Sequence, residues 1–109
     1  MAGSSEVLNL AGKGEILVGS ASESVAATAA AGEEIITITD TRIEAGDIAI
    51  SCQPDAANTS GTLAVVHCYV SADSTLKVVV SNVHASAALT AESMDFKYVI
   101  YSASTNNRA

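Results

Sequence analysis

The sequence predicts an all-β fold: an antiparallel β-sandwich, for which a jelly roll is one candidate topology. Two observations support this class. Apolar residues, many of them β-branched, alternate with polar residues along at least five short segments, and turn residues separate these segments at short intervals. No segment has the periodicity of a convincing amphipathic helix. Alternation does not reveal strand order, so an immunoglobulin-like sandwich stays open beside the jelly roll.

The N-terminal part predicts an extended arm over residues 1–23, ahead of a sandwich domain over residues 24–109. The arm is rich in Gly, Ser, Ala and Glu. Its apolar residues fall in short groups and are candidate anchors on a partner: Val7, Leu8, Ile16, Leu17 and Val18. Residues 24–31 are ambiguous, because their Ala content favours a helix that Gly32 would end, whereas their Thr favours a strand.

Five segments from residue 33 onward are predicted strands. They span residues 34–39, 47–52, 63–70, 75–81 and 95–102. Residues two apart in a strand share a face, so each apolar series marks a face that would meet the core. Four such series are Ile36 and Ile38; Ile48, Ile50 and Cys52; Leu76, Val78 and Val80; and Phe96, Tyr98 and Ile100.

The predicted strand 63–70 carries apolar side chains on both faces. One face holds Ala64, Val66, Cys68 and Val70. Val65, His67 and Tyr69 lie on the other face, and Val79 similarly breaks the alternation of strand 75–81. These four residues are candidates for a subunit interface, because aromatic residues favour interfaces. Alternatively, these four residues belong to a second face that is buried inside the sandwich.

Composition and charge exclude some classes of partner. The chain has 109 residues, enough for one domain, and a formal net charge of −7. This acidity argues against a nucleic-acid partner and against an anionic membrane surface. Three Tyr, one Phe and no Trp leave a thin core of small side chains, which would gain burial by oligomerising. With neither a long apolar run nor a signal peptide, synthesis in a cytoplasm is expected.

Cys52 and Cys68 both fall on apolar strand faces, so a disulfide and two buried thiols are both open. A disulfide would stabilise the fold by about 3 kcal/mol, whereas cytoplasmic synthesis favours reduced thiols. Zinc is disfavoured, because His67 and Cys68 are neighbours that point to opposite faces, and His84 completes no ligand spacing. No metal site is therefore predicted.

No catalytic constellation emerges from the sequence. Cys68 faces inward, no Ser stands in a nucleophile elbow, and no phosphate loop is present. The chain is predicted to be no enzyme and to need no cofactor. Asp40, Glu44 and Asp47 surround one turn with Arg42, but they lack the spacing of a calcium loop. A solvated turn with a local Arg–carboxylate contact is the favoured interpretation.

Two stretches carry a distinctive pattern. Residues 36–51 (ITITDTRIEAGDIAIS) run from a Thr-rich strand through a loop into an acid-led apolar strand, and residues 82–101 end in a final apolar strand. The most specific element comprises Asn82, Val83, His84, Ala85, Ala87, Ala88 and Leu89. Over residues 24–101 the chain resembles a family of small structural proteins of phage virions. It departs from that family at residues 90–93, where a Gly-containing turn is expected, and in having two cysteines.

The resemblance implies a capsid decoration (cement) protein that binds the outer capsid surface and stabilises the head. It implies a homotrimer on the virion, made in the host cytoplasm, with the major capsid protein as partner and the arm as the capsid contact. The alternative is a fibre or spike head domain that binds a host receptor, through loop 53–61 and the acidic turn 40–47. A carbohydrate-binding module is a weaker alternative, because Trp is absent.

Overall fold

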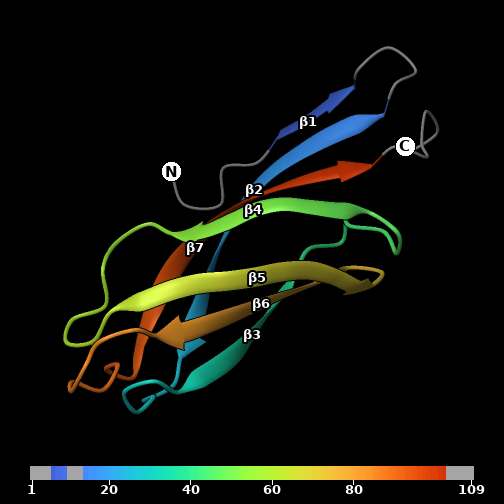
Figure 1. The fold of residues 1–109 in the computed structure, drawn as a ribbon. Coiled ribbons are helices and arrows are strands. Elements are labelled where there is room, and N and C mark those ends of the chain that lie inside the picture. Colours follow the sequence, from blue (N-terminus) through green and yellow to red (C-terminus); the bar gives the residue numbers. More distant parts are fainter. Residues whose placement is uncertain (1–5, 10–13, 103–109) are drawn as a thin grey trace.

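The computed structural model describes residues 6–9 and 14–102, and it confirms the all-β prediction. Two antiparallel sheets pack as a sandwich, with strand orders β1-β2-β7-β4 and β3-β6-β5 (Figure 1). The strands are β1 (Glu6–Asn9), β2 (Glu15–Val25), β3 (Glu33–Thr39), β4 (Ile48–Pro54), β5 (Leu63–Ala72), β6 (Thr75–Asn82) and β7 (Glu92–Ser102). In these described ranges, no helix is long and apolar enough to cross a membrane.

The chain winds around the sandwich in the manner of a jelly roll. β2 lies beside β7 in one sheet and β3 lies beside β6 in the other, so an antiparallel ribbon wraps over both sheets. Each of the connections β2–β3, β3–β4, β4–β5 and β6–β7 crosses from one sheet to the other. β5 and β6 form a hairpin within one sheet. This strand order decides between the two candidate topologies in favour of the jelly roll.

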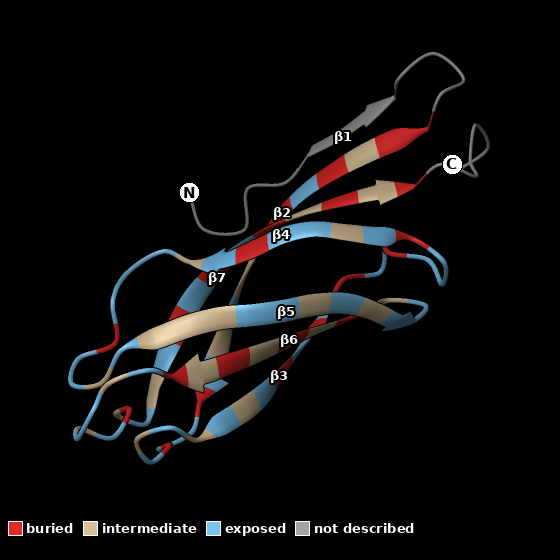
Figure 2. Ribbon diagram, viewed as in Figure 1, coloured by how far each residue is buried: buried red, intermediate tan, exposed pale blue. Residues whose placement is uncertain are grey.

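The core lies between the sheets, where three strands follow the predicted alternation. Leu76, Val78 and Val80 of β6 are completely buried. Figure 2 shows the same alternation of buried and exposed residues along β7 and β3. The predicted inward series of these two strands are confirmed, with exposures of 3% or less: Ile36, Ile38, Phe96, Tyr98 and Ile100.

The predicted arm is wrong over residues 15–23. β2 pairs with β7 along its whole length, from Glu15 with Ser102 to Val25 with Glu92, and Leu17 is completely buried. The predicted domain boundary after residue 23 therefore falls inside a strand. Val7 and Leu8 lie in β1, whose backbone pairs with β2, but their side chains lie outside the described part of the chain.

The ambiguous segment 24–31 forms no helix. Its first residues complete β2, and Thr28 makes an isolated bridge to Leu89. Thr28 also accepts through its backbone carbonyl from the Leu89 amide at 2.8 Å. The Thr in this segment therefore marks extended backbone, and its alanines form a connection between the sheets.

Bulges in β4 and β5 overturn two predicted faces. The pairing of β4 with β7 shifts between Ala49 and Ser51, so Cys52 is buried while Ile48 and Ile50 are each 56% exposed. The pairing of β5 with β6 shifts between Val65 and His67. Val65 therefore packs against the core, and Val66 is exposed instead.

Candidate functional site

The outer face of the four-stranded sheet is apolar at one end. Ile16 of β2 and Ile48 of β4 both pair with Tyr101 of β7, so their side chains form a row across the sheet. In the next row Val18 pairs with Val99. Ile50 adjoins this row at the bulge. The apolar end patch is defined by these six residues: Ile16, Val18, Ile48, Ile50, Val99 and Tyr101.

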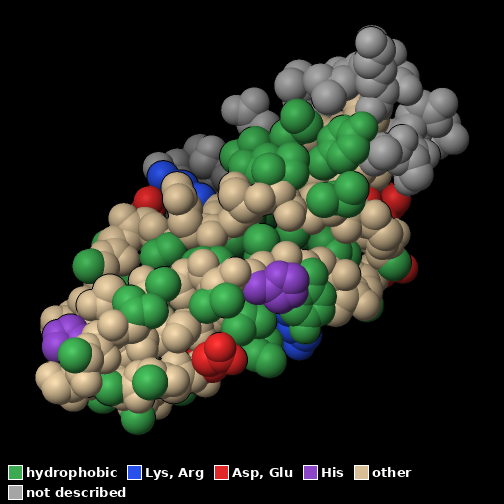
Figure 3. Space-filling view, viewed as in Figure 1, with side chains coloured by type: hydrophobic (Ala, Val, Ile, Leu, Met, Phe, Trp, Pro, Cys, Tyr) green, Lys and Arg blue, Asp and Glu red, His purple; other side chains and the backbone are tan. Residues whose placement is uncertain are grey.

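The six side chains of the apolar end patch are uncharged; Val18, Ile48 and Ile50 are exposed, and the other three are half-buried. Val18 is 44% exposed, and hydrophobic side chains gather at this end of the molecule in Figure 3. In the row of Val18, the backbone register places Glu6 of the edge strand β1 beside the patch. One row further along β7, Lys97 pairs with Ser20 and forms an ion pair with Asp55 at 3.2 Å. Contiguous apolar surface on an acidic chain is typical of a protein contact site.

The three-stranded sheet has a second, mixed outer face. Val79 pairs with Ile35 on one side and with His67 on the other. His67 stacks on Tyr69, with ring centroids 5.0 Å apart and planes inclined by 26°. This His67–Tyr69 face therefore brings together three of the four predicted interface residues, His67, Tyr69 and Val79, but not Val65. Whether it makes a subunit contact stays a prediction.

The acidic turn after β3 is a hydrogen-bonded structure. Asp40 is 8% exposed and accepts from the Arg42 guanidinium at 2.6 and 2.9 Å and from the Tyr98 hydroxyl at 2.6 Å. Burial alone would raise the pKa of Asp40, but the hydrogen bonds from Arg42 and Tyr98 outweigh it and lower that pKa. Asp47 accepts from the backbone amide of Glu44 at 3.0 Å. These contacts fit a structural turn.

Asn82 and His84, from the distinctive stretch that runs from Asn82 to Leu89, hold the loops at the end of the sandwich opposite the apolar end patch. Asn82 is completely buried, and its side-chain amide donates to the carbonyls of Thr28 and Ala87 at 3.1 and 2.8 Å. Its side-chain oxygen accepts from the amides of His84 and Thr62. The His84 ring accepts from the Ala87 amide at 2.9 Å. The structure thus gives this stretch a structural role.

The histidines do not converge with the cysteines. His67 lies on an outer sheet face, whereas Cys68 packs against the core, as their adjacency on a strand predicts. Both cysteines are free thiols. Within the described ranges, no group of three or more His, Cys, Asp or Glu side chains lies close enough to hold a metal ion.

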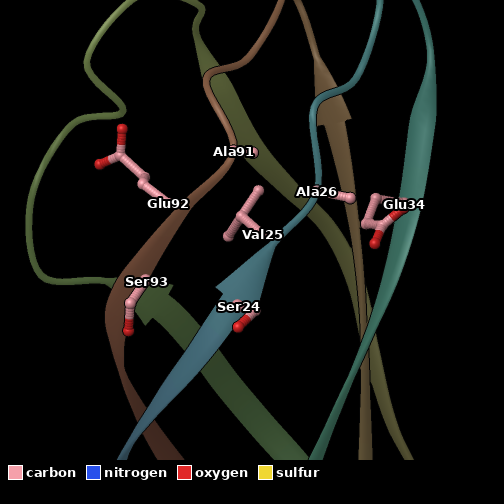
Figure 4. Close-up of a pocket in the computed structure, with 7 residues that line it drawn as sticks. All are labelled: Ser24, Val25, Ala26, Glu34, Ala91, Glu92 and Ser93. Carbon is pink, nitrogen blue, oxygen red and sulfur yellow. The ribbon is translucent and has the colours of Figure 1, made fainter.

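A shallow hollow lies where β2 ends and β3 and β7 begin (Figure 4). Its lining is small or apolar except for Glu34 and Glu92, which project on opposite sides of it. The Glu92 carboxylate accepts from the Thr59 backbone amide at 3.2 Å, so it is directed at the neighbouring loop.

Comparisons with known proteins do not assign a family. The chain matches no family model, no curated protein and no solved structure.

Part of the apolar end patch is visible in the sequence if both faces of the predicted strand 95–102 are considered. Val99 and Tyr101 alternate with buried Ile100, so this strand ends apolar on both faces. Of the predicted anchors, Ile16 and Val18 belong to the apolar end patch, whereas Leu17 points into the core. The contribution of β4 could not be found from alternation, because it depends on the bulge.

Proposed function

We propose that the chain is a structural, non-enzymatic protein of a phage particle, a decoration (cement) protein that binds the outer capsid surface. The observation that carries this proposal is the apolar end patch on a domain of net charge −7. An acidic domain stays soluble through its charge, so an uncharged apolar area on it favours a role in docking. The resemblance of residues 24–101 to small virion proteins supplies the class of partner, the major capsid protein.

The docking surface in this proposal differs from an extended arm. Ile16 and Val18 lie on β2 within a paired sheet, next to Tyr101 and Ile48 of neighbouring strands. A preformed surface loses little conformational entropy on binding, which favours attachment at many equivalent sites. Many such contacts across neighbouring capsid subunits would stabilise the head.

The His67–Tyr69 face is the proposed contact between copies in a homotrimer. It combines two stacked aromatic rings with exposed Ile35 and half-buried Val79. Aromatic residues are enriched at interfaces, and a trimer would extend the burial of a thin core.

Quantitative mass spectrometry of purified particles tests the function. The particles are those produced by the genome that encodes this chain, and the chain is counted relative to the major capsid protein. A decoration protein is expected in copy numbers comparable to those of the capsid subunit. Far fewer copies would point to the fibre or spike head instead, and absence from the particles would reject both roles.

A further inference from the structure

Cys52 and Cys68 lie on the two strands that border the same open edge of the sandwich. β4 is the last strand of the four-stranded sheet and β5 the last strand of the three-stranded sheet, and these strands contact each other (Figure 1). Cys52 is 6% exposed, and Cys68 is partly buried against the same core cluster. The two thiols thus come from opposite sheets into one region of the core.

The bulge in β4 is what directs Cys52 inward. Without the shift between Ala49 and Ser51, strand alternation would place Cys52 on the outer face with Ile48. With it, Ile50 is exposed and Cys52 is buried. On β5, Cys68 faces the core together with Val70. The two edge strands, β4 and β5, therefore each direct one cysteine into the core.

From this placement we infer that Cys52 and Cys68 are an oxidation site, at which a disulfide bond joins the two sheets across their open edge. This inference does not depend on the proposed function. The oxidant it requires is a small-molecule disulfide such as oxidised glutathione. The cross-link would close a loop over residues 53–67, and it would tie together two edge strands that no backbone ladder joins.

The chemistry is a pair of thiol–disulfide exchanges. The thiolate of Cys68, the less buried thiol, attacks the small disulfide, forms a mixed disulfide and releases one small thiol. The thiolate of Cys52 then attacks the Cys68 sulfur and releases the second small thiol. The two protein thiols lose two electrons and two protons, and the small disulfide gains them.

The surroundings of the thiols make this oxidation slow and dependent on pH. Burial, together with the nearby Cys68, raises the pKa of Cys52 to about 12, and burial also raises the pKa of Cys68. Because the thiolate is the reacting form, the rate of cross-linking should rise roughly tenfold per pH unit between pH 7 and pH 9. The contribution of Cys68 to the raised pKa of Cys52 is consistent with the two thiols lying close together.

Peptide mapping without reduction tests the site. The full chain is incubated folded with oxidised glutathione, excess oxidant is removed, and the protein is cut before aspartates. This cleavage separates peptide 47–54, which holds Cys52, from peptide 55–72, which holds Cys68. The expected result is an intact mass lower by two hydrogen atoms and a linked pair of these peptides. The linked protein should melt about 10 °C higher than the reduced one.

Two single variants, Cys52→Ser and Cys68→Ser, serve as matched controls. Neither should lose hydrogen atoms in this way, because each retains one thiol. The inference is overturned if the folded wild type keeps both thiols free at pH 9, or carries one glutathione on each cysteine, or forms a covalent dimer. A linked protein that melts lower than the reduced one would equally reject it, because the bond would then conflict with the native fold.

Discussion

Tyr98 connects the two halves of the fold at the residue scale. Its ring lies over Gly19, its partner on β2, and a Cβ atom on that glycine would lie 2.5 Å from two ring carbons. Its hydroxyl donates to Asp40, just beyond the end of β3 in the other sheet. Gly19 therefore creates the space through which one side chain links the sheets.

Replacing Tyr98 with Phe is predicted to lower the free energy of unfolding by about 2 kcal/mol, because a hydrogen bond to a buried carboxylate is lost. Urea denaturation followed by circular dichroism measures the change. Tyr69→Phe is the matched control, since the Tyr69 ring is 37% exposed and only the hydroxyl is removed. Equal effects of the two substitutions would contradict a structural role for the Tyr98–Asp40 contact.

Asp40 is predicted to make stability sensitive to acid. Its folded-state pKa is lowered, because hydrogen bonds from Arg42 and Tyr98 outweigh the effect of burial. The stability it contributes is therefore present above its unfolded pKa of about 3.9 and is lost as pH falls through the lower folded value. Unfolding of wild type and Asp40→Asn at pH 7 and pH 2 measures this.

The difference in unfolding free energy between these two proteins should be large at pH 7 and should shrink at pH 2. Asp55→Asn provides the control, because Asp55 forms an exposed ion pair with Lys97 and should show little such change. An unchanged difference between wild type and Asp40→Asn across this range would show that the Asp40 charge does not stabilise the fold.

At the scale of the elements, the alternation of apolar and polar residues predicts those strands that have one face in the core and the other on the surface. β3, β6 and β7 bury one face under the opposite sheet, so their apolar series appear directly in the sequence. The bulges of β4 and β5 could not be predicted in this way, because one extra residue reverses every later face. For this reason Ile48, Ile50 and Val65 lie on the faces opposite to those that alternation predicts.

The middle of β2 gives no strand signal because its inward residues there are small. Gly19 and Ala21 face the sandwich interior, Gly19 under the Tyr98 ring, and Ser20 and Ser22 face outward. A run of Gly, Ser and Ala has the composition of a flexible segment, although its residues point alternately inward and outward. What decides its structure is its pairing with β7, a contact between residues far apart in the sequence.

Deletion of residues 2–23 is predicted to unfold the domain, since it removes most of a strand that lies between β1 and β7. Deletion of residues 2–9 removes only the edge strand β1 and is predicted to leave a cooperative fold. Thermal unfolding monitored by circular dichroism compares the two. A cooperative transition in the longer deletion would mean that residues 15–23 act as an arm after all.

At the scale of the whole molecule, two outer faces are available for assembly. The sequence indicated the His67–Tyr69 face through its aromatic residues, and it indicated part of the apolar end patch through Ile16 and Val18. The full patch needs three strands in register, which only the tertiary structure provides.

The homotrimer is tested by light scattering coupled to size exclusion. The chain has a mass of 11.0 kDa, so a trimer is predicted at about 33 kDa, three times that value. The double variant Ile35→Thr/Tyr69→Ala should shift the mass toward that of the monomer, because it removes exposed apolar area from the His67–Tyr69 face. A folded wild-type monomer would show that the chain forms no trimer before it meets the capsid.

Co-sedimentation with capsids stripped of the chain measures whether the apolar end patch is the docking face. The double variant Ile48→Thr/Ile50→Thr keeps β-branched residues on β4 but removes apolar area, whereas Val83→Thr alters a residue that is 60% exposed elsewhere. Wild type and Val83→Thr are predicted to bind even at high salt, since the contact is apolar. The double variant should lose at least tenfold in affinity, equivalent to about 1.4 kcal/mol. Binding of the double variant at wild-type affinity would contradict this docking role of the patch.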